Sequence, residues 1–123
     1  MAWNFHLSRE ARADVKNILK LTLKDFGPQA RLRYNELIYQ ALDDIAENPD
    51  RIGSQKQRLR GKDFLTYHLK HSKEKARTDK GIVKQPRHII FYLKKEGKTL
   101  KIVRILHERR DFSRHISDEL DSL

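Results

Sequence analysis

The residues whose types could do chemistry lie together near the end of the chain. Shortly after Arg104, an imidazole, a carboxylate and two guanidinium groups occupy four consecutive positions, His107, Glu108, Arg109 and Arg110. Cutting a phosphodiester needs a base, an acid and cations that stabilise the developing charge. The pattern therefore predicts a nuclease site built on Arg104, His107 and Arg109. Alternatively, it predicts a charged surface that binds a target through Arg104, His107, Arg109 and Arg110.

The strand that leads into this cluster argues against a compact nuclease site. Side chains alternate between the two faces of a regular strand, so Arg104 and His107 point to opposite sides unless a bulge intervenes. Arg104 could instead pack its stem on the sheet and pair with a carboxylate, and His107 could cap or hydrogen-bond at the strand end. Further candidates for a nuclease site are Lys70, His68 and His88.

Neither a metal site nor a cofactor site is predicted. The sequence has six histidines and no cysteine, whereas zinc needs three or four convergent ligands. His68 and His71 lie three positions apart on a predicted strand, so they face opposite sides. The two common glycine-rich phosphate-binding motifs, GxGxxG and GxxxxGK(S/T), are both absent.

The first half of the chain predicts a strand followed by two helices. Apolar and other residues alternate over residues 2–7, which is the period of a strand. Ser8 is a typical N-cap, and apolar residues at helical spacing follow it as far as Phe26. Gly27-Pro28 then ends the first helix and opens the second, which continues to Asn48-Pro49. So short a connection predicts an antiparallel helical hairpin.

The second half predicts three strands and an α+β fold. Residues 49–62 are polar and rich in turn-forming types, and a strand follows at about 64–71. Two further strands, over 88–94 and 99–107, are joined by a tight turn in which Gly97 takes the left-handed conformation. The strand at 88–94 is apolar on both faces, so we expect it in the middle of the sheet. The order βααβββ predicts one domain, residues 1–123, in which a helical hairpin packs on a small antiparallel sheet.

A basic loop at about 71–87 separates the third predicted strand from the second. From Lys70 to Arg87, seven lysines and arginines oppose two acids, a net charge of +5. Because few apolar residues offset the entropy of ordering, residues 72–85 are expected to be mobile and to be the first site of trypsin cleavage. The chain ends in an acidic tail at 118–123.

The composition favours a partner that carries negative charge. The 123 residues include 27 Lys and Arg against 17 Asp and Glu, a formal net charge of +10. Such an excess suits a nucleic acid or an acidic protein. The N-terminus lacks the apolar stretch of a signal peptide, and no run of residues is long and apolar enough for a membrane span. We therefore expect a soluble cytoplasmic protein with no membrane partner.

Several segments, in this order, resemble the ParE branch of the RelE/ParE toxin superfamily. They are LSREARADVKNILKLTLKDFG, ALDDIAENP, RHIIFY and IVRILHERRDFSRHI. The resemblance implies a toxin of a type II toxin–antitoxin system, of the kind that stabilises plasmids. It implies a hetero-oligomer with a cognate acidic antitoxin, ParD-like or other, that holds the toxin inactive.

The same resemblance leaves two targets open. The ParE branch is associated with inhibition of DNA gyrase by binding, whereas the RelE branch cuts messenger RNA on the ribosome. Relatives that cut RNA often carry a tyrosine or histidine near the C-terminus. Here the last tyrosine is Tyr92, inside a predicted strand, which departs from the RelE pattern. A gyrase inhibitor is therefore the leading hypothesis, and a ribosome-dependent endoribonuclease is the alternative.

The resemblance also implies that an acidic, partly disordered antitoxin segment wraps the helical hairpin. The outer faces of the predicted helices carry basic residues, including Lys16 and Lys20, that would attract such a chain and speed its encounter. Phe26, Tyr34 and Leu37 would supply apolar anchors in the grooves beside them. These five residues are the predicted antitoxin-binding site.

Overall fold

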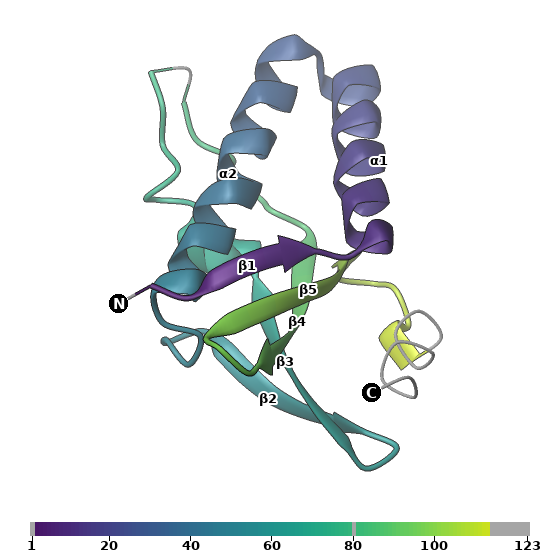
Figure 1. The fold of residues 1–123 in the computed structure, drawn as a ribbon. Coiled ribbons are helices and arrows are strands. Elements are labelled where there is room, and N and C mark those ends of the chain that lie inside the picture. Colours follow the sequence, from purple (N-terminus) through teal and green to yellow (C-terminus); the bar gives the residue numbers. More distant parts are fainter. Residues whose placement is uncertain (1, 80, 114–123) are drawn as a thin grey trace.

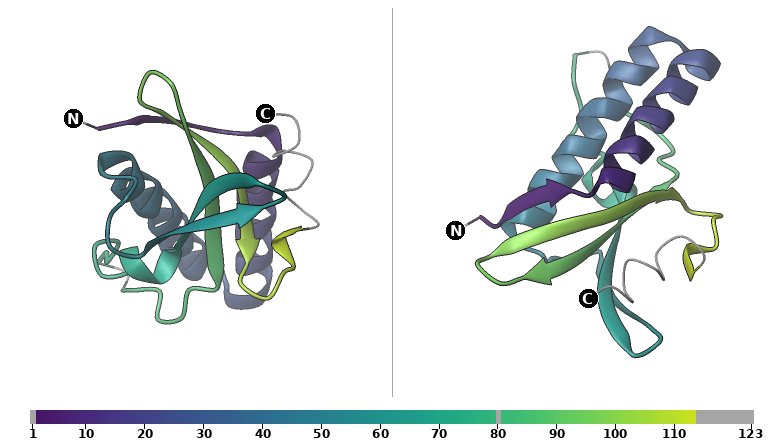
Figure 2. Two further views of the ribbon diagram at one scale, coloured as in Figure 1. Left: turned by 90° about the horizontal axis from the view of Figure 1, so that it is seen from below. Right: turned by 45° about the vertical axis from the view of Figure 1, so that its right-hand side comes forward.

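A helical hairpin covers one face of a five-stranded sheet in the computed structural model, which describes residues 2–79 and 81–113 (Figure 1). The elements in chain order are β1 Asn4–Leu7, α1 Arg9–Phe26, α2 Pro28–Glu47, β2 Ser54–Leu59, β3 Lys62–His68, the 3-10 turn η1 Leu69–Ser72, β4 His88–Lys95 and β5 Thr99–His107. The turn between the helices lies far from the sheet (Figures 1 and 2). The predicted α+β architecture is confirmed.

The local signals around both helices are also confirmed. Ser8 caps α1, because its Oγ accepts the amide of Ala11 at 3.0 Å. Gly27 follows α1 with a φ of 94°, a left-handed conformation that glycine adopts without strain. Pro28 opens α2, which ends just before Asn48.

The strand order across the sheet is β1-β5-β4-β3-β2. β4 lies in the middle, as its two apolar faces predicted, and its central residues are buried. Gly97, in the turn to β5, has a φ of 73°, as the predicted tight turn requires. Because β4 is held on both edges, it fixes the positions of the strand ends beside it.

β1 runs parallel to its neighbour β5, with Asn4 opposite Thr99 and Leu7 opposite Ile102. The sheet is therefore mixed, whereas an antiparallel sheet was predicted. Side chains alternate in the same way in both kinds of strand, so the pattern carries no direction. The helical hairpin after β1 is long enough to permit a parallel return. The remaining neighbours pair antiparallel, as predicted.

An additional strand, β2, occupies residues for which only turns were predicted. Its sequence SQKQRL is polar and gives no apolar face. It is the outer strand of the sheet, where polar and basic side chains discourage further pairing. A two-residue turn joins it to β3, with positive φ at Arg60 and Gly61, which matches the twist of hairpin strands. The described elements thus follow the order βααββββ.

The core has two parts, one on each face of the sheet. The main part lies between the helices and the sheet and includes Leu37, Ile38, Leu42, Tyr67, Tyr92, Ile102 and Ile105. The second part lies on the other face and comprises Phe64, Phe91, Leu93, Val103 and Leu106, with Phe112 packed against it. Burial on both faces holds β4 and β5 firmly where they present the residues described below.

The start of the basic loop is anchored to α2. β3 ends at His68 rather than at 71, and the chain turns through η1. Ser72 is buried, and its Oγ donates to Asp44 at 2.5 Å, while Lys75 Nζ lies 3.2 Å from the same carboxylate. Val83 packs against the main core. These contacts were not predicted, because hydrophobic patterns do not reveal a buried carboxylate, and the mobility and early trypsin cleavage of residues 72–85 stay predictions.

The acidic tail predicted at 118–123 lies outside the described residues. Neither α1 nor α2 is long and apolar enough to span a membrane.

Candidate functional site at the ends of strands β3, β4 and β5

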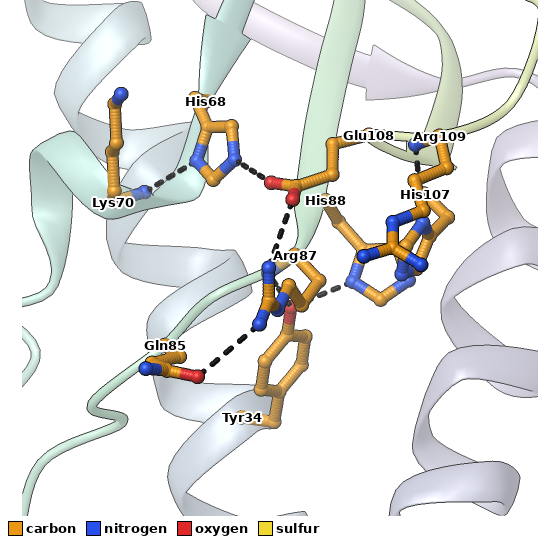
Figure 3. Close-up of polar contacts among 9 residues, drawn as sticks. All are labelled: Tyr34, His68, Lys70, Gln85, Arg87, His88, His107, Glu108 and Arg109. Carbon is orange, nitrogen blue, oxygen red and sulfur yellow. Dashed lines mark hydrogen bonds and ion pairs between the residues drawn. The ribbon is translucent and has the colours of Figure 1, made fainter.

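Three histidines meet where β3 ends, β4 begins and β5 ends (Figure 3). The antiparallel register places His88 opposite His107, with ring centroids 5.4 Å apart. His68 lies on the next strand, opposite Ile89. Tyr34 approaches from α2, and its ring centroid lies 5.5 Å from that of His88. Strand pairing thus gathers residues that are far apart in the sequence.

Glu108 joins these strand ends through both of its carboxylate oxygens. Oε1 lies 2.8 Å from Nε2 of His68, and Oε2 accepts from Nη1 of Arg87 at 3.1 Å. The amide of Glu108 also donates to the carbonyl of Arg87 at 2.8 Å. Hydrogen bonds from His68 and Arg87 lower the pKa of Glu108 to about 2. The carboxylate is therefore charged at neutral pH and already occupied, which makes it a poor general base.

Main-chain amides fix the tautomers of two of the histidines. The amide of Lys70 donates to Nδ1 of His68 at 3.0 Å, and the amide of Arg109 donates to Nδ1 of His107 at 3.1 Å. An amide can only donate, so the proton of each neutral ring lies on Nε2. His68 therefore donates this proton to Glu108 and holds the carboxylate in place.

Tyr34 and His88 form a pair that is uncharged at neutral pH. The Tyr34 oxygen accepts the amide of Arg87 at 3.1 Å and lies 2.6 Å from Nδ1 of His88. Burial raises the pKa of Tyr34 to about 12. Burial and the neighbouring His107 lower the pKa of His88 to about 4. Neither group has a pKa near 7, where proton transfer by a general acid or base is most effective.

Arg104 is held by a carboxylate on α1. Its Nε and Nη2 donate to the two oxygens of Asp14 at 2.7 and 2.8 Å, and the amide of Ile105 donates to the same group at 3.0 Å. The pairing of β4 with β5 shifts register between Phe91 and Tyr92, before Arg104, and is regular from Arg104 to His107. No bulge therefore intervenes between these two residues, and the objection to a compact Arg104–His107 site stands. The interpretation of Arg104 as an arginine paired with a carboxylate is confirmed.

The other predicted residues lie in the cluster or beside it. His107 belongs to the cluster, and its predicted hydrogen bonding at the strand end is confirmed by the amide of Arg109. Arg109 and Arg110 are exposed in the turn that follows β5. The structure therefore brings His107 to the other histidines and leaves two arginines on the surface beside them.

Two members of the cluster, Tyr34 and Arg87, were not predicted to belong to it, and Glu108 was predicted to lie beside His107 but was given no role. Arg87 directly precedes His88, and Glu108 directly follows His107. Because the hairpin places these histidines opposite each other, its register alone could have brought Arg87 and Glu108 together. Among residues 2–79 and 81–113, no group of three or more His, Asp or Glu side chains is placed to hold a metal ion.

Two of the five residues predicted to bind an antitoxin are not accessible. Leu37 is 0% exposed and Tyr34 is 8% exposed, because both belong to the face of α2 that packs on the sheet. They are core residues, so their assignment as partner anchors is wrong. Phe26 is 77% exposed at the end of α1, and Lys16 and Lys20 are exposed on the same helix.

Comparison with known proteins gives a family and a fold. The family model described as "ParE toxin of type II toxin-antitoxin system, parDE" matches residues 5–112. A chain from the solved structure "Chromosomal ParDE TA system from P. aeruginosa" superimposes with a TM-score of 0.62 at 15% identity, over 86% of this chain and 96% of that one. At this identity the likeness shows the fold. The search of curated protein sequences gave no significant match.

Proposed function

Since the chain belongs to the ParE toxin family of type II toxin–antitoxin systems, we propose that it inhibits DNA gyrase by binding, in the cytoplasm, and is neutralised by a cognate acidic antitoxin. The observation that supports binding over cutting is the state of the cluster. Glu108 is ion-paired with a pKa of about 2, and Tyr34 and His88 are neutral, with pKa values of about 12 and 4. A cluster in these states keeps its shape but is poorly suited to proton transfer at pH 7.

The surface proposed to contact gyrase lies beside this cluster. Arg109 and Arg110 are exposed in the turn after β5, and His107 is held by the amide of Arg109. A rigid strand end with two exposed arginines suits a protein interface, where arginine is enriched among the residues that dominate affinity. Arg104 takes part by supporting this end of β5 through Asp14 rather than by touching the target.

Purified protein is expected to inhibit DNA supercoiling by gyrase. The double variant Arg109→Gln/Arg110→Gln should weaken this inhibition about tenfold or more, measured as the concentration that halves supercoiling. The matched control is Lys56→Gln/Lys98→Gln, which removes the same charge from exposed positions elsewhere and should leave inhibition close to that of the wild type. Equal inhibition by both variants would refute the proposed surface.

Induced expression in cells separates this proposal from the endoribonuclease alternative. DNA synthesis should fall before protein synthesis when pulse labels for both are followed after induction. If protein synthesis falls first and ribosome-bound messages are cut at defined codons, the gyrase proposal is wrong.

The proposed antitoxin site keeps Lys16, Lys20 and Phe26 on α1. The fold shared with the P. aeruginosa ParDE TA system supports such a partner. Exposed lysines should attract an acidic chain over a distance, whereas the exposed ring of Phe26 should anchor it after contact. Charge should therefore govern the association rate, and the apolar anchor should govern the dissociation rate.

Reversing Lys16 and Lys20 to Glu is expected to slow antitoxin association several-fold at low salt, with a smaller effect on dissociation. Phe26→Ser should instead speed dissociation, with a smaller effect on association. Both rates can be measured with immobilised antitoxin at low and high salt, with Lys56→Glu/Lys98→Glu as the control for net charge. The assignment fails if the control slows association as much as the α1 variant does.

A further inference from the structure

A polar cleft of 340 Å³ opens beside the histidine cluster. Its lining residues are His68, Lys70, Lys73, Lys84, Gln85, Pro86, Arg87 and Glu108. One wall comes from the end of β3 and η1, and the other comes from the segment that leads into β4. Both walls lie in the basic loop or directly beside it. Neither the gyrase proposal nor the antitoxin proposal gives this loop a role.

The cleft carries an excess of positive charge. The carboxylate in its lining, Glu108, is already bonded to Arg87 and His68. Lys73 Nζ donates to the carbonyl of Lys84 at 3.4 Å, and in the described part of the chain no carboxylate pairs with Lys70, Lys73 or Lys84. Three lysines that pair with no described carboxylate therefore line one hollow, an arrangement that attracts an anion.

The walls of the cleft are held in place before any ligand arrives. Ser72 at the end of η1 is buried and bonded to Asp44 of α2. On the other wall Pro86 is buried, and the guanidinium of Arg87 is fixed between Glu108 and Gln85 at 3.1 and 3.2 Å. A preformed site pays less conformational entropy on binding than a disordered basic arm would.

The residue types that line the cleft indicate which kind of polyanion it suits. Among the eight described residues of the lining, Pro86 alone is apolar, whereas an acidic peptide would need apolar anchors for affinity. None of these eight is Phe, Tyr or Trp, the residues that most often stack on unpaired bases of single strands, and His68 and Arg87, which could also stack on a base, are both bonded to Glu108. We propose that this cleft binds the phosphate backbone of duplex DNA. Such contacts position a protein on DNA without reading its sequence.

This DNA-binding activity goes beyond gyrase inhibition and does not depend on it. The toxin alone, without gyrase, is expected to bind a short mixed-sequence DNA duplex. Because lysine–phosphate contacts release counterions, affinity should fall steeply between about 50 and 200 mM salt. Failure of this binding would overturn the cleft proposal and leave the gyrase proposal standing, since supercoiling inhibition is measured separately.

The decisive variant is Lys70→Gln/Lys73→Gln/Lys84→Gln, measured by fluorescence anisotropy with the labelled duplex. It should bind about tenfold or more weakly, and the slope of log affinity against log salt should fall by about one for each lysine that no longer neutralises a phosphate. The control, Lys24→Gln/Lys56→Gln/Lys98→Gln, has the same net charge and alters exposed residues on other elements. If both variants weaken binding equally, the binding is general electrostatic attraction and the proposal is wrong.

Footprinting of the wild-type protein provides a second measurement that does not depend on the variants. Duplex DNA should protect Lys70, Lys73 and Lys84 from acetylation more than Lys24, Lys56 and Lys98, as followed by mass spectrometry. Single-stranded DNA, single-stranded RNA and polyglutamate serve as competitors. Tighter binding of either single strand, or of polyglutamate at equal charge concentration, would overturn the assignment to duplex DNA.

Discussion

Replacement of Asp44 by alanine is expected to destabilise the protein by about 3 kcal/mol and to open the basic loop to trypsin. The Asp44 side chain is 1% exposed and is the centre of a polar network between α2 and the loop. The five groups that contact it, directly or through Ser72, are Gln40, Arg51, Tyr67, Ser72 and Lys75. Hydrogen bonds to the carboxylate hold its pKa below the ordinary value of 3.8, although burial alone would raise it.

The size of this effect follows from what the variant leaves behind. Alanine would strip the buried hydroxyls of Ser72 and Tyr67 of the acceptor that orders them, and unsatisfied buried groups are costly. Arg51 and Lys75 would lose their counter-charge, but their side chains are 27% and 58% exposed and can turn to water. We therefore expect a loss of stability at the lower end of the range that is typical when one partner of a buried ion pair is removed.

Urea unfolding and limited trypsin digestion test this expectation. In the wild type the first cleavage is expected between residues 73 and 87, and in Asp44→Ala it should become much faster. Asp43→Ala, at the exposed neighbouring position, should stay within about 0.5 kcal/mol of the wild type. Asp44→Asn should fall between the two, because its amide keeps one oxygen acceptor. Equal stability of Asp44→Ala and Asp43→Ala would show that the network contributes little.

The pH dependence of this network has a definite sign. The folded-state pKa of Asp44 lies below its unfolded value, so the carboxylate stabilises the fold above pH 3.8. This contribution is lost as the pH falls through the folded-state pKa. In urea unfolding at stepped pH, the wild type should therefore be more stable than Asp44→Asn near pH 7, and the difference should shrink as the pH falls below 3.8.

Local signals predicted the helices and the central strand but not the long-range polar contacts. Ser8, Gly27 and Pro28 act on their own neighbours, so their sequence context was sufficient. β2 was missed because an edge strand buries little and needs no apolar face. The direction of β1 was missed because alternation is the same in parallel and antiparallel strands.

The functional site was only partly predicted, because the sequence shows which residues are neighbours in the chain but not which distant residues meet in the fold. His107, Arg109 and Arg110 stand together in the sequence, so their proximity needed no knowledge of the fold. The assignment of Tyr34 failed because its phenol reaches across the fold to His88 and Arg87, which lie far away in the chain. Helical periodicity can show that Tyr34 faces the interior. It cannot show that this face of the helix meets the start of a particular strand.

The second large effect is expected at His88, as a loss of stability between pH 6.5 and about 4. His88 is held neutral by burial and by His107 and His68, and its folded-state pKa is about 4 against an ordinary 6.5. Between these values the unfolded chain binds a proton that the folded protein does not, so the free energy of unfolding falls with falling pH. This shift in the pKa of His88 corresponds to a loss of about 3 kcal/mol in the free energy of unfolding, and the loss is complete at about pH 4.

Other groups titrate in or near this range, and their effect must be separated from that of His88. The pKa of His71 is also lowered by burial, so it adds to the loss with the same sign. Glu108 and Asp14 face His88 and oppose its shift, and Glu108 itself stabilises the fold above pH 4.5 and ceases to do so as the pH falls towards 2. A variant of His88 alone is therefore needed.

His88→Asn is the matched substitution, because its Oδ1 can replace Nδ1 as the partner of the Tyr34 hydroxyl without titrating. It should be somewhat less stable than the wild type at pH 7, since the ring packing on Tyr34 and His107 is lost. Its stability should nevertheless change much less between pH 6.5 and 4. The control His6→Asn, at an exposed position on β1, should keep the wild-type slope. If urea unfolding at stepped pH gives His88→Asn the same slope as the wild type, His88 is not the buried neutral group whose protonation destabilises the fold between pH 6.5 and 4.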